Sequence, residues 1–200
     1  MKNSILPLWL SIIIVTNSLA QSISESDRSK VLSHLQESKN KLLNTIGNLS
    51  EEQLYYKPSA SKWSIAECLE HLALSEKSLS AAIQMTHNEE SGRVDQTDIA
   101  LSDEALIELI TDRTNKVKTR AEFEPTESFG SFQSTLAAFR EVRESNIHFV
   151  ENTSSNLRSQ YFDFPFGKVD AVQVLLFISA HTQRHVQQMK ELISLQSFPG

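Results

Sequence analysis

Apolar residues recur every three or four positions in five stretches of the chain, which is the spacing of one helix face. The stretches are residues 26–46, 64–87, 103–118, 131–152 and 170–195. Five glycines and five prolines in 200 residues interrupt them little. The pattern predicts an all-α protein, a four-helix bundle in which the first, second, fourth and last stretches build the core and 103–118 is an additional short helix.

Two of these helices have recognisable start signals. Ser64 and Glu67 have the spacing of a capping box, in which each side chain bonds the other residue's backbone N–H. Asp170 is suited to cap the last helix. The connection 153–169 is rich in phenylalanine, so we expect it to pack across the end of the bundle.

The first twenty residues have the character of a secretory signal. Lys2 supplies a positive charge, residues 5–15 are mostly apolar, and Ser18-Leu19-Ala20 fits a cleavage site. The apolar run is shorter than the ~20 residues that a membrane span needs. We therefore expect cleavage near Ala20, export to the periplasm or beyond the cell, and one domain over residues 21–200 with no stable membrane insertion. An uncleaved anchor is the alternative.

The charge balance argues against a nucleic-acid partner. Loss of residues 1–20 removes one lysine, so the formal net charge changes from −6 to −7. Binding to phosphates needs clustered Lys and Arg, and the chain has no basic stripe. Cys68 is the single cysteine, so no intrachain disulfide can form and stability must come from packing. We expect a small-molecule substrate and leave the oligomeric state open, a homodimer included.

Three histidines are the strongest candidates for chemistry. His181 and His185 are four residues apart, so their rings share one helix face, and Val174 and Leu192 on the same stripe predict that this face points inward. Buried imidazoles need either hydrogen bonds or a metal. With His71 from another helix they could bind one ion and leave a coordination position open, as in catalytic sites. Spacing alone does not show which helices touch, so a chance pairing stays the alternative.

Two parts of the chain resemble the motifs of the DinB-like (YfiT-like) superfamily. The first is W-S-I-A-E-C-L-E-H-L at 63–72, and the second is F-G-K-V-D at 166–170 followed by H-T-Q-R-H-V-Q-Q at 181–188. The resemblance extends in helix order over nearly all of the chain beyond the signal. It implies a four-helix bundle that binds one divalent metal through three histidines. Those positions match His71, His181 and His185.

The resemblance implies either a hydrolase that acts through metal-activated water or a transferase that uses a low-molecular-weight thiol. Export favours hydrolysis, because such thiols are scarce outside the cell. A non-catalytic bundle that binds a metal or a ligand is the rival class. Imidazole ligands suit several metals, of which we expect Zn or Ni. Catalytic residues are not assigned, but Arg184 and Gln188 fit the motif and could orient a histidine or contact substrate; a solvated charge is the alternative for Arg184.

The other reactive side chains have simpler interpretations. We expect Cys68 to be a small buried apolar residue and Glu67 to cap its helix rather than act as a base. The aromatic residues of 162–166 are core residues or line a pocket mouth. Three further histidines have no partner at ligand spacing and are expected at the surface or in packing: His34, His87 and His148.

Overall fold

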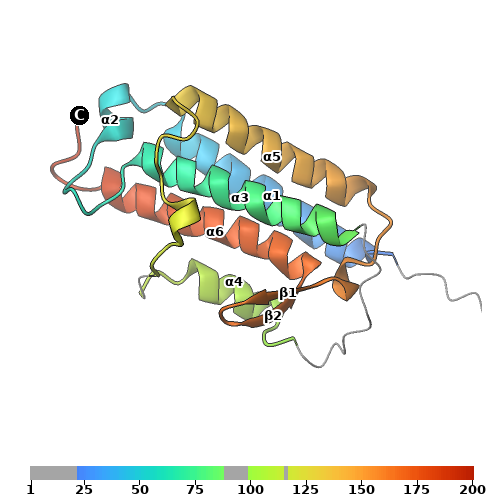
Figure 1. Ribbon diagram of the computed structural model, residues 1–200. Coiled ribbons are helices and arrows are strands. Elements are labelled where there is room, and N and C mark those ends of the chain that lie inside the picture. The colour runs from blue at the N-terminus through green and yellow to red at the C-terminus, as the bar shows by residue number, and fades with distance from the viewer. Residues whose placement is uncertain (1–21, 88–98, 115–116) are drawn as a thin grey trace, which may run out of the picture.

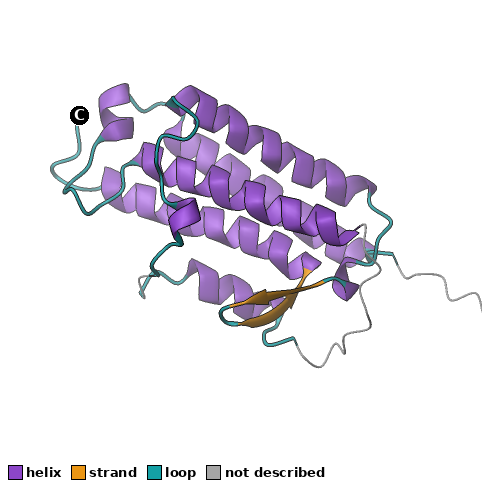
Figure 2. Cartoon of the chain, in the orientation of Figure 1, coloured by secondary structure: helices purple, strands orange, loops and turns teal. Residues whose placement is uncertain are grey.

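The computed structural model describes residues 22–87, 99–114 and 117–200, which are mostly helical (Figure 2). These ranges contain six α-helices and one antiparallel hairpin. The elements in chain order are α1 (Glu25–Ile46), α2 (Glu51–Tyr55), α3 (Ile65–His87), α4 (Asp103–Thr111), the 3-10 turn η2 (Ala121–Phe123), α5 (Phe132–Asn152), the 3-10 turn η3 (Leu157–Ser159), β1 (Tyr161–Phe164), β2 (Gly167–Asp170) and α6 (Ala171–Ile193).

Four long helices pack side by side into a bundle (Figure 1). Helices α1 and α3 each pack against both α5 and α6, and α4 lies along α6 outside this set. The sequence-based prediction of a helical bundle built from the first, second, fourth and last long helices is therefore confirmed. No helix in the described ranges is both long enough and apolar enough to cross a membrane.

The predicted helix starts agree with the structure. The Glu67 N–H donates to Ser64 Oγ at 3.1 Å, and the Ser64 N–H donates to Glu67 Oε2 at 2.7 Å. Asp170 caps α6 by accepting from the Gln173 N–H at 2.8 Å. Because both caps satisfy backbone N–H groups that a helix leaves without partners, they fix where α3 and α6 begin.

Apolar side chains fill the bundle in two clusters, one around Leu35, Val150 and Leu175 and the other around Leu42 and Met189. Between them, each of the four long helices contributes buried polar side chains, which we call the polar layer. Its members are Ser38, Glu76, Arg143, Asn146 and Thr182. A polar group inside a bundle is tolerated when its hydrogen bonds are satisfied, so this layer depends on its internal contacts.

Three elements differ from the sequence-based prediction. The helix expected over 103–118 ends at Thr111, where Asp112 leaves the helical conformation and its carboxylate accepts from the Thr114 N–H at 2.8 Å. Helix α2 was not predicted, although Ser50 and Gln53 form a capping box at its start. The connection 153–169 contains β1 and most of β2, so the helical fold includes a small hairpin.

Candidate metal centre

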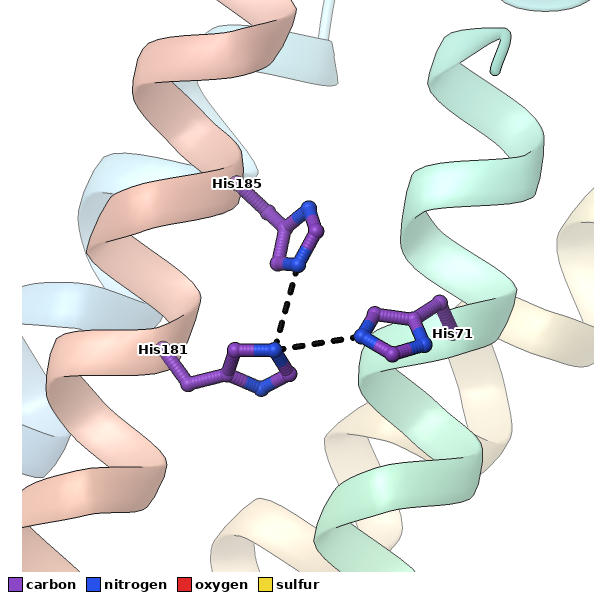
Figure 3. Close-up of side chains that lie close together, drawn as sticks. All are labelled: His71, His181 and His185. Carbon is purple, nitrogen blue, oxygen red and sulfur yellow. Dashed lines mark hydrogen bonds between the residues drawn. The ribbon is translucent and has the colours of Figure 1, made fainter. Parts of the chain in front are cut away.

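The imidazole rings of His71, His181 and His185 point toward one another between α3 and α6 (Figure 3). His181 Nε2 lies 3.1 Å from the Nε2 atom of His71 and 3.1 Å from that of His185. His71 and His185 are buried and His181 is half-buried. The structure thus brings together the three residues that the sequence singled out as metal ligands.

A backbone carbonyl fixes the tautomer of His71. Phe123 O lies 2.8 Å from His71 Nδ1, and a carbonyl can only accept, so Nδ1 carries the ring proton. In a neutral imidazole the other nitrogen is then a lone-pair acceptor. His71 therefore directs the lone pair of Nε2 toward the other two histidines. Outer hydrogen bonds of this type are usual for histidines that bind metals.

The two short contacts between imidazole nitrogens cannot both be ordinary hydrogen bonds. His71 Nε2 carries no proton, so its 3.1 Å contact needs a proton on His181 Nε2. That nitrogen then has no lone pair left to accept from His185, which lies 3.1 Å away on the same atom. In addition, His185 Nδ1 is buried without a hydrogen-bond partner among the described residues. Neutral rings alone leave this cluster incompletely satisfied.

The surroundings keep the three imidazoles neutral. Burial lowers the pKa of His71, although the hydrogen bond to Phe123 opposes part of that effect. Burial, followed by the nearby His71 and Arg184, lowers the pKa of His181 to about 3. Burial and then the neighbouring histidines hold the pKa of His185 well below its ordinary value. Neutral rings are what a metal requires, because a protonated nitrogen has no lone pair to donate.

Two of the three nitrogen pairs have the spacing that a shared divalent transition-metal ion would need. Two nitrogens 3.1 Å apart, each bonded to one ion at about 2.0–2.1 Å, subtend roughly 95–100° at that ion. This angle lies between octahedral and tetrahedral geometry. All three ligand atoms lie within 4.8 Å of one another. An ion at this position would accept the lone pairs that protons cannot satisfy.

Aromatic rings surround the cluster. The Trp63 ring lies 4.9 Å from that of His71 and 6.2 Å from that of His185, between centroids. The Phe177 ring stacks on His181 with a centroid distance of 5.6 Å. Phe177 also packs against Phe164 of the hairpin. The phenylalanines of the connection are therefore half-buried against the core, and the connection reaches the histidines through Phe177.

Arg184 and Gln188 have contacts that the sequence did not predict. The Arg184 guanidinium donates to the backbone carbonyls of Ile110 and Asp112, so it holds the end of α4 against α6. Gln188 accepts from Arg113 at 3.4 Å, and Arg113 also forms a bidentate pair with Glu191. The positive charge of Arg113 contributes to lowering the pKa of His185, a role that no sequence motif indicated.

The remaining candidates are placed outside the cluster. Cys68 is buried, and burial raises the pKa of its thiol to about 12, so it stays protonated. Glu67 is engaged in its cap and accepts from Lys57 at 2.6 Å. His148 lies on the exposed side of α5, where its ring contacts Asn152, and His34 is half-buried in α1. The side chain of His87 lies outside the described residues.

A helical bundle with three convergent histidines on two neighbouring helices defines a class of candidate metal-binding proteins. Residues 34–189 match the sequence model of the DinB superfamily, and this chain belongs to that superfamily. It is 32% identical over 150 residues to YuaE of Bacillus subtilis (strain 168), an uncharacterized protein, with 74% of this chain and 88% of YuaE covered.

A solved structure shares the fold. YfiT from Bacillus subtilis superposes with a TM-score of 0.57 at 18% sequence identity, over 86% of this chain and 89% of that one. YfiT is described as a "probable metal-dependent hydrolase with an unusual four-helix bundle topology". At this identity the likeness concerns the architecture, and it agrees with the bundle of α1, α3, α5 and α6.

Proposed function

We propose that the protein binds one divalent transition-metal ion, Zn or Ni, through Nε2 of His71, His181 and His185, and acts as a metal-dependent hydrolase on a small molecule. The observation that carries the proposal is the pair of 3.1 Å contacts between imidazole nitrogens, which protons alone cannot satisfy. The description of YfiT as a hydrolase supports the reaction type.

The chain's own residues prepare such a site in two ways. The Phe123 carbonyl holds the proton of His71 on Nδ1, and burial keeps the other two rings neutral, so three lone pairs are available. Because the ligands are uncharged, they leave the full positive charge of an ion uncompensated. When bound, a divalent ion in this setting supplies a Lewis acid that activates water for attack on an ester or amide carbonyl.

The carboxylates of α3 near His71 in sequence do not offer a free general base. Glu67 is bound in the helix cap and to Lys57. Glu70 accepts from three backbone N–H groups, and Glu76 forms a buried ion pair with Arg143. The thiol of Cys68 is held in its neutral form, which is a poor nucleophile. The proposed hydrolysis therefore rests on the ion and its ligands.

A structural metal site is the second candidate. His71 belongs to α3 and the other two ligands to α6, so an ion bound by all three would join two helices of the core. The burial of His71 and His185 favours this function, since catalytic sites need access for a substrate.

One experiment separates the two candidates. The protein, purified without a metal-affinity step, is compared with its chelated form in thermal unfolding and in turnover of ester, amide and thiol-transfer substrates. A hydrolase keeps its fold after chelation, loses turnover and regains it with Zn(II) or Ni(II). His71→Ala removes turnover and His148→Ala does not. If chelation unfolds the protein and no substrate is converted with metal present, the structural site is correct and the hydrolase is not.

We also propose that the protein is exported, with cleavage near Ala20. Residues 1–20 lie outside the described part of the chain, so the support is the charge, apolar run and cleavage pattern of the sequence. N-terminal sequencing of the native protein should begin at Gln21. A sequence that begins at Met1 would contradict cleavage.

A further inference from the structure

A segment that connects α4 to α5 lies against the candidate metal centre. We call residues 117–130 the strap; it contains η2 and runs across the bundle beside α3 (Figure 1). The strap supplies Phe123 O, which accepts from His71 Nδ1 at 2.8 Å, and Thr119 Oγ1, which lies 3.5 Å from the same nitrogen. The tautomer of His71 therefore depends on where the strap is held.

Glu70, the residue before His71, holds the strap. Its carboxylate accepts from the backbone N–H groups of Thr126 at 3.1 Å, Glu127 at 3.1 Å and Ser128 at 2.7 Å. The side chain is buried, with 6% of its surface exposed. Within the described ranges its partners are these backbone groups rather than a basic side chain. Hydrogen bonds to an ionised carboxylate are stronger than neutral ones, so this contact is the firm attachment of the strap.

The backbone of the strap is shaped around that carboxylate. Glu127 has φ +60°, a left-handed conformation that is sterically unfavourable for a residue other than glycine. This conformation lets consecutive N–H groups converge on one anion, in the manner of a backbone nest. Without the Glu70 carboxylate, the three N–H groups lose their common acceptor, and these hydrogen bonds no longer offset the unfavourable conformation of Glu127.

We propose that Glu70 is a positioning residue for the metal centre. By binding Thr126, Glu127 and Ser128 it keeps the Phe123 carbonyl against His71 Nδ1, which presents the Nε2 lone pair to the metal. The inference rests on the proposed metal binding by the three histidines. Among the described residues the hydrogen bonds of the Glu70 carboxylate go to the strap and not to the histidine rings, so Glu70 acts through the strap.

The test compares Glu70→Gln with Glu122→Gln. Both changes replace a carboxylate by an amide, but Glu122 is an exposed strap residue beside Phe123. Glutamine at position 70 keeps one acceptor oxygen and turns an NH2 group toward backbone donors. We expect its Zn(II) dissociation constant to rise about 10–100-fold, as for other outer partners of metal ligands. Glu122→Gln should stay within about twofold of the wild type by the same measure.

A second readout needs no metal. Nitrogen-15 NMR of the chelated wild-type protein should show His71 as the Nδ1–H tautomer, and Glu70→Gln should show a mixture. Glu70→Asp keeps the negative charge but shortens the side chain by one methylene. Its fraction of the Nδ1–H tautomer should lie between those of the wild type and Glu70→Gln. This variant also keeps the test usable if Glu70→Gln fails to fold. If the tautomer and the Zn(II) affinity are unchanged in both Glu70 variants, the positioning role is wrong. If the wild type binds no metal but the tautomer shifts, the proposed function fails and the role of Glu70 in orienting His71 stands.

Discussion

Arg143 and His185 are both buried polar side chains in the middle of the same bundle, but their partners differ in kind. Arg143 is fully buried, and its guanidinium donates to Glu76 at 2.6 and 2.8 Å, to Ser38 at 2.8 Å and to Thr182 at 2.8 Å. It also donates to the Leu35 carbonyl at 3.0 Å. Its N–H groups donate to acceptors on the three other long helices, so the hydrogen bonds of Arg143 are satisfied within the bundle.

The histidine cluster lacks such complementarity. Its three Nε2 atoms have each other as neighbours, and one proton on His181 Nε2 cannot make both 3.1 Å contacts ordinary hydrogen bonds. His185 Nδ1 has no partner among the described residues. The polar layer is thus satisfied by its own hydrogen bonds, whereas the histidine cluster keeps nitrogen lone pairs without a donor, as a cation-binding site would.

The largest expected effect is the loss of stability when the polar layer loses Arg143. Arg143→Met leaves the Glu76 carboxylate buried without its partner, which should cost about 3–5 kcal/mol of unfolding free energy. Adding Glu76→Leu removes that stranded charge, so the double variant should recover much of the loss. Urea denaturation measures both.

The matched control for this prediction is the surface pair between half-buried Lys39 and exposed Glu144, whose charged atoms lie 2.7 Å apart. Lys39→Ala should cost no more than about 1 kcal/mol. A loss of that small size in Arg143→Met would show that the polar layer does not hold the helices together.

Removal of a histidine should affect metal affinity more than folding. His185→Ala takes away one of three lone pairs, and we expect metal affinity to fall more than about 100-fold, beyond the usual loss of an outer partner. It strands no buried charge, so it should destabilise the chelated protein less than Arg143→Met does. Competition titration and urea denaturation give the two numbers. His148→Ala is the control, and equal affinity in the two histidine variants would exclude His185 as a ligand.

Bound metal should stabilise the folded wild type, and the effect grows with the logarithm of the metal concentration relative to Kd. At a free concentration of about 100 times Kd, a ligand of the folded state adds roughly 2.7 kcal/mol. For a chain of this size that corresponds to a rise in Tm of roughly 5–10 °C. Scanning calorimetry with and without Zn(II) measures the shift. His185→Ala should show almost none, and a full shift in that variant would place the ion elsewhere.

The smallest effect concerns pH in the chelated protein. The pKa of His181 is lowered from 6.5 to about 3, so the folded state binds fewer protons than the unfolded state below pH 6.5. The stabilising contribution is present above pH 6.5 and is lost as pH falls from there toward 3, by up to about 1.4 kcal/mol per pH unit. Denaturation between pH 7 and 5 should show this slope, and His181→Ala should reduce it. Equal slopes would contradict the neutral state of the His181 ring over this pH range.

The sequence predicted the parts of the molecule that have local patterns. The Ser64–Glu67 box and Asp170 are short-range signals, and the helical period indicated the four core helices. The three histidines could be predicted as one site because His181 and His185 share a helix face and the family motif at 63–72 contains His71. Residues 1–20 lie outside the described ranges, so the signal segment stays a prediction.

The parts that escaped prediction depend on contacts between distant segments. Arg143 and Glu76 look like surface charges in the helical pattern, because burial of an ion pair is decided by which helices meet. The role of Glu70 depends on a backbone loop more than fifty residues later in the chain. The hairpin at 161–170 was not predicted, because its aromatic residues are as typical of a packed connection as of a β-strand.

Anomalous X-ray scattering would locate a zinc ion bound to the three histidines. Crystals of the protein grown with Zn(II), without an affinity tag, would be measured on both sides of the zinc absorption edge. We expect one anomalous peak between α3 and α6, about 2.0–2.1 Å from Nε2 of each of His71, His181 and His185. A map with no peak among these three nitrogens, at a zinc concentration that fills other sites, would contradict this expectation.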